Sequence, residues 1–397
     1  AGELGLDGLV RHIPGVLSLA LYAKEAGLLR LFVPENDAAE AALVDGLTIY
    51  PVKSLGQLVR HFTGEEVIAP FVKTEEIKTA GQYAMDMAYV KGQEFAKRAL
   101  EIAASGSHNI LMSGPPGSGK TLLAKSLPSI LPRLTSSEVL EVTKIYSVAG
   151  LLEGPYVEER PFRSPHHTAS GVALVGGGRI PHPGEISLAH RGVLFLDEFP
   201  EFPRFVIENL RQPLEDGTIT VSRAEGTWSF PARFILVASQ NPCPCGFRSD
   251  PDHPCVCSPS QFQKYQKKIS GPLLDRIDLH VEVPRVQFEK LSKDELAEPS
   301  ANIRERVERA REIQSRRFKG LDIQTNSEMT GKEIRQFCVL SNDSVDLLRA
   351  AVNRLHLSAR GYNRILKLSR TIADLAGQDK IATEHVAEAL QFRAKEG

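Results

Sequence analysis

The chain has 397 residues, a formal net charge of −1 and 42% hydrophobic residues. This length predicts two or three domains with substantial cores, and the charge excludes a uniformly basic nucleic-acid-binding protein while leaving room for a local basic surface. No run approaches 18 apolar residues and no signal peptide is visible, so we expect a cytoplasmic protein without a membrane span.

Residues 1–62 alternate short apolar strands with helical runs, a pattern that predicts a small α/β unit. A linker is expected to follow over residues 63–83. The elements expected in the unit are a helix at Val16–Ala26, a strand at Leu28–Val33, a helix at Asp37–Val44, a strand at Leu47–Val52 and a helix at Leu55–Phe62.

A phosphate-binding loop fills residues 114–121, which read Gly-Pro-Pro-Gly-Ser-Gly-Lys-Thr and complete the G-x-x-x-x-G-K-[ST] pattern. It follows an apolar run, Asn109–Ser113, suited to a buried strand, and precedes Leu122–Leu127, whose apolar spacing is helical. Backbone N–H groups and the helix dipole would cradle phosphates there. We expect Lys120 to reach the β- and γ-phosphates and the Thr121 hydroxyl to hold Mg²⁺. The predicted nucleotide-binding residues are Gly114, Pro115, Pro116, Gly117, Ser118, Gly119, Lys120 and Thr121.

Two carboxylates close the next long apolar run, Gly192–Leu196. Such a run predicts a central strand buried on both faces, and parallel sheets bind their ligands at the C-terminal ends of the strands. Asp197 is therefore expected in the Mg²⁺ shell, and Glu198 as the base that polarises the attacking water. Both roles are specific to nucleotide hydrolysis.

Residues 216–230 predict a β-hairpin, because β-branched residues alternate up to a turn at residues 223–226 and aromatic residues follow it. Arg223 at the tip could contact a phosphate backbone. The alternative is an ordinary surface hairpin whose arginine is merely solvated.

A polar amide follows the third apolar run, Phe234–Ser239, which predicts another strand. Asn241 at that strand tip could hydrogen-bond the γ-phosphate or the lytic water. Alternatively, it simply starts a turn before the proline that follows.

The segment Gly271–Asp278 places Arg276 between two acidic residues. A structural ion pair is the simplest interpretation. The alternative is an arginine finger, which stabilises transition-state charge on a neighbouring subunit's nucleotide.

Four of the five cysteines form two C-x-C pairs separated by nine residues. Stable disulfides are not expected in a cytosolic protein, and four thiolates could coordinate zinc tetrahedrally, although the spacing departs from the usual C-x₂-C. Free loop thiols are the alternative, with His253 as a substitute ligand. The fifth cysteine, Cys338, is expected in the core. The candidate zinc ligands are Cys243, Cys245, Cys255 and Cys257.

Residues 84–290 are expected to form the ATPase core, and residues 291–397 an α-helical lid. The lid is predicted from helical patterns that follow Pro284–Ser300. These patterns are Asn302–Phe318, Gly331–Cys338, Ser341–Leu355, Ala359–Ala376 and Thr383–Phe392.

Four segments are more specific than a phosphate loop alone: Arg163–Thr168, Leu174–Gly178, Ala189–Glu198 and Gly271–Asp278. Together they resemble the magnesium-chelatase-like ComM/YifB family of AAA+ ATPases, over essentially the whole chain. That family is associated with natural competence and DNA branch migration. The resemblance implies a hexameric motor that uses ATP and Mg²⁺ and acts on single-stranded or branched DNA.

The resemblance also implies roles that spacing alone does not show. Asn241 would be the sensor 1 residue, Arg276 the arginine finger and Arg360 the sensor 2 residue. Arg364 lies four residues further on, on the same helical face, so it remains an alternative to Arg360. The hairpin at residues 216–230 would point into the ring.

The opening segment Gly2–Gly8 resembles the second half of a Lon-protease-like domain, which this family carries at its N-terminus. The chain would then begin inside that domain, so residues 1–62 are expected to be a partial Lon-like unit. The dyad lysine of Lon proteases aligns with Leu17, and the serine-bearing segment is absent. Peptidase activity is therefore not expected.

Two classes of function stay open, because they share every ATPase residue. One is a DNA-remodelling motor, and the other is a chelatase-like motor subunit that remodels a protein partner such as a metal-insertion enzyme. DNA is favoured, because chelatase motor subunits generally lack the N-terminal unit and the cysteine cluster. The adjacent His166 and His167 are expected in a surface loop rather than at a shared metal, since neighbouring residues face different ways. The side chains that favour contact with a polyanion are Arg163, His166, His167, Arg179 and Arg223.

Overall fold

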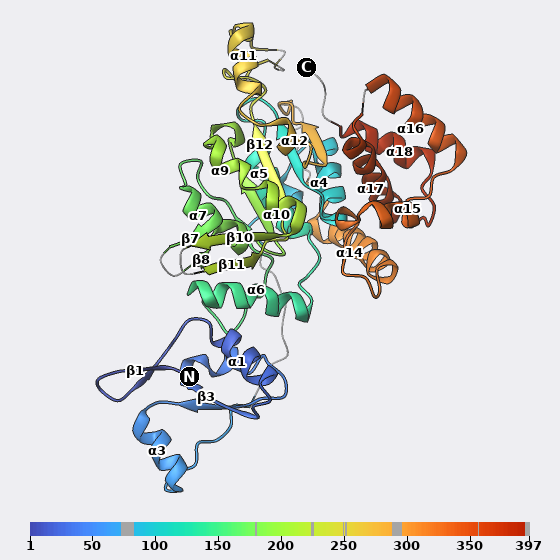
Figure 1. Ribbon diagram of the computed structural model, residues 1–397. Coiled ribbons are helices and arrows are strands. Elements are labelled where there is room, and N and C mark those ends of the chain that lie inside the picture. Colours follow the sequence, from blue (N-terminus) through green and yellow to red (C-terminus); the bar gives the residue numbers. More distant parts are fainter. Residues whose placement is uncertain are drawn as a thin grey trace.

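The structure is a computed structural model that describes residues 1–72, 83–178, 181–223, 226–248, 250, 252–287, 296–355 and 357–393. Within this part of the chain, three regions follow one another (Figure 1): an N-terminal α/β region, a central region built on a sheet, and a group of C-terminal helices beside it. No helix of the described residues is both long and apolar enough to cross a lipid bilayer.

A five-stranded parallel sheet forms the central region, with strand order β13-β5-β12-β9-β6. Successive residues of the three middle strands contribute to two separate hydrophobic clusters, one on each face, which explains why these strands are mostly apolar. The three predicted apolar runs form the middle of this sheet. The strands are β5 (Ile110–Ser113), β6 (Phe162–Arg163), β9 (Val193–Leu196), β12 (Ile235–Gln240) and β13 (Leu279–Glu282).

Short helices and a small ribbon surround the sheet. Local signals set their limits: α6, for example, begins with a capping box made by Thr135 and Glu138 and ends at Gly150 in the left-handed conformation. The elements are η2 (Met87–Tyr89), α4 (Glu94–Gly106), α5 (Lys120–Ser126), η3 (Leu127–Ile130), α6 (Ser136–Ala149), α7 (Gly171–Val175), β7 (Gly176–Gly177), β8 (His182–Pro183), α8 (Glu185–Leu188), η4 (Phe199–Glu201), α9 (Arg204–Glu208), α10 (Arg211–Asp216), α11 (Pro259–Gln266) and α12 (Gly271–Leu274).

The predicted hairpin is present as β10 (Thr218–Arg223) and β11 (Gly226–Pro231), which pair antiparallel. Gly217 connects it to α10 with φ +65, and a Cβ at Gly217 would lie 2.8 Å from the side chain of Arg233. A glycine is therefore needed where the helix turns into the hairpin. Two of the predicted polyanion contacts, residue Arg179 and the side chain of Arg223, lie outside the described part of the structure.

The N-terminal region contains the predicted strands and helices, with one helix shortened, and also a short two-stranded ribbon before them that was not predicted. The expected helix at Asp37–Val44 is reduced to a 3₁₀ turn, η1 (Glu35–Asp37), and a single α-turn, α2 (Ala38–Ala41). The prediction of a full helix is wrong because the N–H groups of Leu43 and Val44 bond to carbonyls three residues back, which tightens the chain out of the α-helix. The other elements are β1 (Glu3–Leu4), β2 (Val10–Arg11), α1 (Val16–Glu25), β3 (Arg30–Pro34), β4 (Thr48–Val52) and α3 (Leu55–Thr63).

A buried carboxylate joins the N-terminal region to helix α6 of the central region. Glu40, 5% exposed, accepts hydrogen bonds from the backbone N–H of Leu17 at 2.7 Å and from the Ser147 hydroxyl at 2.5 Å. Gly15 donates to the same hydroxyl at 3.0 Å. Loss of either hydrogen bond would leave the buried carboxylate with less compensation for its charge, which is costly.

The helical patterns predicted after residue 300 are confirmed within two residues at each end. Helices α14 and α17 pack on α4, and their apolar residues belong to the same hydrophobic cluster as those of β5 and β13. The C-terminal helices and the sheet therefore share one core. The elements are α14 (Ser300–Arg317), η5 (Asn326–Glu328), α15 (Gly331–Phe337), α16 (Asn342–Leu355), α17 (Ala359–Leu375) and α18 (Thr383–Gln391).

Candidate functional site

The phosphate loop connects β5 to α5 at the C-terminal edge of the sheet. Gly119, the N-cap of α5, has φ +91, a left-handed conformation that favours glycine. A Cβ at Gly114 would lie 2.1 Å from the carbonyl oxygen of Val283, just after β13. Both glycines are thus required for the loop to fold closely over the helix N-terminus, whose N–H groups and dipole attract phosphate.

Lys120 lies inside this loop and is 9% exposed. Its Nζ donates to two carbonyl oxygens of the loop at 2.7 and 2.9 Å, and it lies 3.4 Å from Oδ1 of Asn241. Burial lowers the pKa of Lys120, while the nearby Asp197 and Glu198 oppose this shift. The structure therefore brings together the loop lysine and the amide at the end of the third predicted strand.

Thr121, the residue after the lysine, meets Asp197. The Thr121 hydroxyl donates to Oδ2 of Asp197 at 2.9 Å, and the Ser239 hydroxyl donates to Oδ1 of the same carboxylate. A hydroxyl and a carboxylate side by side are the oxygen ligands that suit Mg²⁺, so these residues fit the ion. Ser239, at the end of β12, was not predicted; it fixes the orientation of the carboxylate.

Glu198 begins the turn after β9 with φ +52 and ψ +45, a left-handed conformation. For a residue other than glycine this conformation costs about 1–3 kcal/mol and persists only where the surroundings hold it. Its backbone N–H donates to Oδ1 of Asp197 at 3.0 Å and to the Ser239 hydroxyl at 3.3 Å. The strained turn leaves the Glu198 side chain 57% exposed beside the phosphate loop.

His167 contacts this glutamate, with Nδ1 at 3.4 Å from Oε2 of Glu198. The expectation that His166 and His167 face different ways is wrong, since their rings lie 4.1 Å apart at an angle of 33°. A hydrogen-bonded turn from Ala169 N to His166 O brings the two side chains to the same side. Sequence reasoning missed the link to Glu198, because it depends on where the loop after β6 crosses the sheet.

Arg163 is engaged within the chain. It forms two hydrogen bonds to the carboxylate of Glu185 on α8, at 2.6 and 2.7 Å, and its side chain is 30% exposed. A guanidinium bound through two N–H groups to a carboxylate is a strong, oriented pair. The assignment of Arg163 to a polyanion is therefore replaced by a structural ion pair.

A cavity of about 550 Å³ adjoins the phosphate loop. The residues before α4 and after β13 form its far wall, including Lys91, Gln93 and Arg285. Gln93, with φ +61, donates through Nε2 to the carbonyl oxygen of Ser118 at 3.2 Å and thereby ties this wall to the loop. The cavity extends away from the phosphate loop, and a nucleoside would lie in it. No sequence motif predicted the residues of its far wall.

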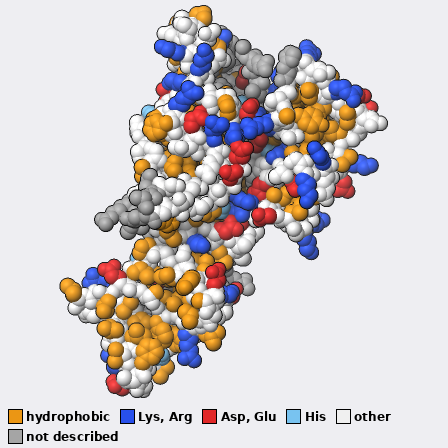
Figure 2. All heavy atoms as spheres, in the orientation of Figure 1, with side chains coloured by type: hydrophobic (Ala, Val, Ile, Leu, Met, Phe, Trp, Pro, Cys, Tyr) orange, Lys and Arg blue, Asp and Glu red, His pale blue; other side chains and the backbone are white. Residues whose placement is uncertain are grey.

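Arg276 and Arg360 lie elsewhere and converge on one carboxylate. An Nη2–Oε2 hydrogen bond joins Arg276 to Glu215, and Nη2 of Arg360 is 3.7 Å from Oε1 of Glu215. Both arginines, with Arg364, line a cavity of about 460 Å³ that has no lining residue in common with the cavity at the phosphate loop. Figure 2 shows charged side chains of both signs gathered between the central region and the C-terminal helices.

The two candidates for sensor 2 differ in how freely they can move. Arg364 donates to the carbonyl oxygen of Asp275 at 2.5 Å, and its side chain is 12% exposed. The Arg360 side chain is 58% exposed, and among the described residues its one ion-pair contact is the long one to Glu215. Arg360 is therefore the freer of the two to reach a phosphate.

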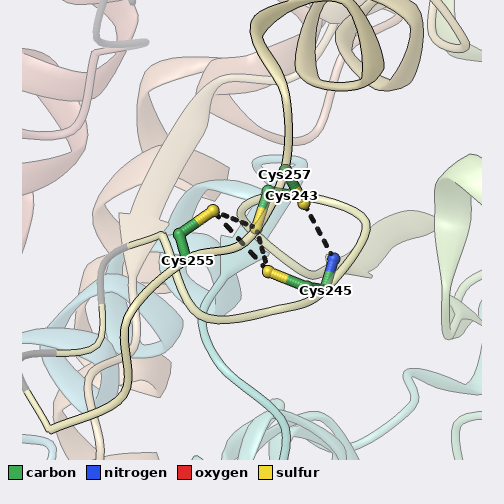
Figure 3. Close-up of side chains that lie close together, drawn as sticks. All are labelled: Cys243, Cys245, Cys255 and Cys257. Carbon is green, nitrogen blue, oxygen red and sulfur yellow. Dashed lines mark hydrogen bonds between the residues drawn. The ribbon is translucent and has the colours of Figure 1, made fainter.

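The four clustered cysteines point toward one another (Figure 3). The sulfurs of Cys243, Cys245 and Cys255 are 3.4–3.7 Å apart, and all four lie within 4.8 Å of one another. Four thiolates bonded to zinc at about 2.3 Å would be about 3.8 Å apart at the corners of a tetrahedron. The cluster thus has the dimensions of a metal site. His253 instead stacks on Phe247, 5.2 Å between ring centroids.

The backbone around the cluster favours a thiolate at Cys245, whereas at Cys255 and Cys257 the backbone hydrogen bonds are outweighed by burial and the neighbouring thiols, which raise the pKa of both. The N–H of Phe247 is the main cause that lowers the pKa of Cys245 to about 6, and Cys245 N donates to Sγ of Cys257 at 3.3 Å. The loop also rests on the phosphate loop, since a Cβ at Gly246 would lie 2.7 Å from Pro116. The loop that carries the cysteines therefore packs directly against the phosphate loop.

Comparison with known proteins gives consistent matches along the chain. The family model for magnesium chelatase subunit ChlI matches residues 86–291, and that for the C-terminal part of ChlI matches residues 297–393. Competence protein ComM of Haemophilus influenzae is 45% identical over 397 residues, covering 99% of this chain and 77% of that protein. The uncharacterized protein YifB of Escherichia coli is 42% identical over 398 residues, covering 99% and 76%.

A more distant match is DNA replication licensing factor Mcm2 of Drosophila melanogaster, 26% identical over 261 residues that cover 62% of this chain and 26% of that protein. The ChlI family model alone covers more than half of the chain. The five-stranded parallel sheet, the phosphate loop and the adjoining helices agree with it. The chain belongs to the magnesium-chelatase-like family of AAA+ ATPases that includes ComM and YifB.

Proposed function

We propose that this chain is the subunit of a homo-hexameric, ATP-driven DNA motor that promotes branch migration, a helicase activity, in recombination during natural transformation. The observation that carries the ATP-hydrolysing part of the proposal is the convergence of Lys120, Thr121, Asp197 and Glu198 at one edge of the sheet. Family membership implies ATPase activity. The names of ComM and of Mcm2 support competence and DNA as the context.

In the proposed reaction, Thr121 and Asp197 would hold Mg²⁺, which would supply positive charge beside the phosphates of ATP. Lys120 contributes a second positive charge from inside the loop. Glu198 accepts a hydrogen bond from the attacking water and aligns it with the γ-phosphorus. Asn241, next to the lysine ammonium, offers a hydrogen bond to the γ-phosphate or to that water.

Assembly into a ring is supported by the position of the two further arginines. Arg276 and Arg360 line a cavity separate from their own phosphate loop, so we assign Arg276 as the arginine finger that acts on a neighbouring subunit's nucleotide. The exposure of Arg360 favours it over Arg364 as sensor 2.

The same proposal divides the chain into four parts. Residues 1–62 are a Lon-protease-like α/β unit, and residues 63–83 are a linker. Residues 84–290 are the AAA+ core with its hairpin and cysteine cluster, and residues 291–397 are the helical lid.

We assign the cysteine cluster to zinc in a structural role. Protein purified without added metal should contain close to one zinc per chain by elemental analysis. The double variant Cys243→Ser/Cys257→Ser should lose the zinc and a large part of the ATPase rate, because the loop supports Pro116 and follows Asn241. Cys338→Ser, a buried cysteine outside the cluster, is the matched control and should keep its zinc. Metal-free wild-type protein with four freely titrating thiols would reject the site.

DNA contact is assigned to the hairpin of β10 and β11. Binding should weaken with salt by about 0.7–0.9 logarithmic units per decade for each phosphate neutralised. Arg223→Ala should reduce this slope by about one unit and weaken all sequences alike, leaving the DNA-free ATPase rate nearly unchanged. An unchanged DNA affinity with a collapsed ATPase rate would instead place the hairpin at the subunit interface.

The second candidate function is a chelatase-like motor subunit that remodels a protein partner, favoured by the match to the ChlI family model. One measurement separates the two: the ATPase rate of the purified protein with and without single-stranded or branched DNA. A rate that rises with DNA supports the DNA motor. A rate that is indifferent to every DNA form would favour the protein-remodelling function.

A further inference from the structure

Glu215 stands between Arg276, the proposed arginine finger, and Arg360, the proposed sensor 2 residue. It lies near the end of α10, and its two oxygens face Arg276 on one side and Arg360 on the other. Its hydrogen bond from Arg276, followed by the charges of Arg276, Arg360 and Arg211, lowers its pKa. At neutral pH it is therefore an ionised acceptor shared by two guanidinium groups.

Arg276 is held inside its own subunit by this contact. Nη1 donates to the carbonyl oxygen of Pro272 at 2.6 Å, Nη2 donates to Glu215, and the side chain is only 11% exposed. Nε is buried and has no hydrogen-bond partner among the described residues. In this position two of the five N–H groups of the guanidinium are bound within their own subunit, and little of the side chain is exposed to a phosphate of another subunit. Leaving Glu215 would free Nη2 for such a contact.

A phosphate group can compete for this guanidinium. Arginine binds carboxylate and phosphate with the same planar arrangement of N–H groups, and phosphate carries the larger negative charge. Arg360, which is 58% exposed, remains beside Glu215 to balance its charge once Arg276 has left. The exchange replaces one ion pair by another and leaves no buried charge unpaired.

Glu215 is also mechanically linked to the hairpin. Gln212, one turn earlier on α10, donates through Nε2 to the Thr220 hydroxyl at 3.1 Å and accepts from Thr220 N at 3.4 Å. Only Asp216 and Gly217 separate Glu215 from β10. A displacement of the hairpin would therefore move α10 and change the distance from Glu215 to Arg276.

We infer that Glu215 is a positioning residue that restrains Arg276 within its own subunit, and that displacement of the hairpin by DNA releases this arginine for the neighbouring nucleotide. The inference rests on the proposed function, in which Arg276 is the arginine finger and the hairpin contacts DNA. Glu215 would thus act on hydrolysis through Arg276, and DNA would act on the Glu215–Arg276 contact through the hairpin.

The test measures ATPase rate per subunit at saturating ATP, at a protein concentration where that rate no longer rises, with and without single-stranded DNA. Glu215→Gln should raise the DNA-free rate about two- to fivefold, the factor that an exposed ion pair contributes to an equilibrium. The stimulation by DNA should fall by the same factor. Asp216→Asn, which removes the neighbouring charge on the same helix, should behave like the wild type.

Two further variants tie the effect to Arg276. Glu215→Gln/Arg276→Ala should be as slow as Arg276→Ala alone, because the gain passes through this arginine. Glu215→Asp, which keeps the charge on a shorter side chain, should give an intermediate DNA-free rate, and it decides the question if the glutamine variant is unstable. A DNA-free rate at or below wild type in both Glu215 variants would overturn the inference. A wild-type rate that ignores DNA would defeat the DNA proposal, yet the DNA-free rates would still decide the role of Glu215.

Discussion

Glu198→Gln should bind ATP with an affinity close to wild type and turn it over about 10²- to 10⁴-fold more slowly, the contribution typical of a general base. The amide keeps the size of the side chain but loses the charge that aligns the attacking water. Lys120, Thr121 and Asp197 are untouched, so Mg–ATP should still bind. Equilibrium binding of a fluorescent ATP analogue and steady-state phosphate release measure the two effects separately.

The matched control is Glu201→Gln, three residues further along. That glutamate lies at the end of η4 and pairs with Lys268 at 2.7 Å on the surface, so its neutralisation should leave turnover unchanged. Turnover near the wild-type rate in Glu198→Gln would show that Glu198 is not the catalytic base.

Arg276→Ala should reduce turnover by about 10³- to 10⁵-fold, as expected for loss of an arginine finger, while each subunit still binds ATP. Lys120→Ala should also be inactive, because its own phosphate loop lacks the lysine that contacts the nucleotide, whereas its Arg276 is intact. Mixing the two inactive proteins should restore part of the activity, because some interfaces then join an intact loop to an intact arginine. The phosphate release rate across a range of mixing ratios reports the recovery.

Two controls make this experiment decisive. Arg349→Ala, at an exposed position on α16 where the side chain pairs with Asp346, should retain wild-type turnover and so separates loss of the finger from loss of any arginine. Co-purification of differently tagged variants must show that mixed rings form. If mixed rings form but are inactive at every ratio, Arg276 acts on the nucleotide of its own subunit.

The sequence predicted the parts of the fold and site that depend on contiguous residues. A phosphate loop is a single segment whose glycines, lysine and threonine have fixed spacing, so residues 114–121 could be identified directly. The three middle strands are apolar on both faces, which gives an unbroken run of buried residues. Both edge strands escaped prediction: β6 has only two residues, and β13 follows the arginine segment without a distinct boundary.

Contacts between distant segments could not be predicted in this way. Ser239 meets Asp197 only because β12 and β9 are neighbours in the sheet, and His167 meets Glu198 through a loop with no regular period. Glu215 carried no motif, since an acid at the end of a short helix is common. The prediction that Arg163 contacts a polyanion was wrong, because the sequence shows the charge of this residue but not its ion pair with Glu185.

The single core shared by the sheet and the C-terminal helices has a consequence for how the protein unfolds. Helices α14 and α17 are buried against α4. Unfolding of the C-terminal helices would therefore expose the core of the sheet region, and the reverse also holds, so the two regions should melt in one cooperative transition. The N-terminal region has its own hydrophobic cluster, to which helix α6 adds little besides Leu140. Calorimetry should therefore resolve two transitions, a small one for the N-terminal region and a large one for the rest.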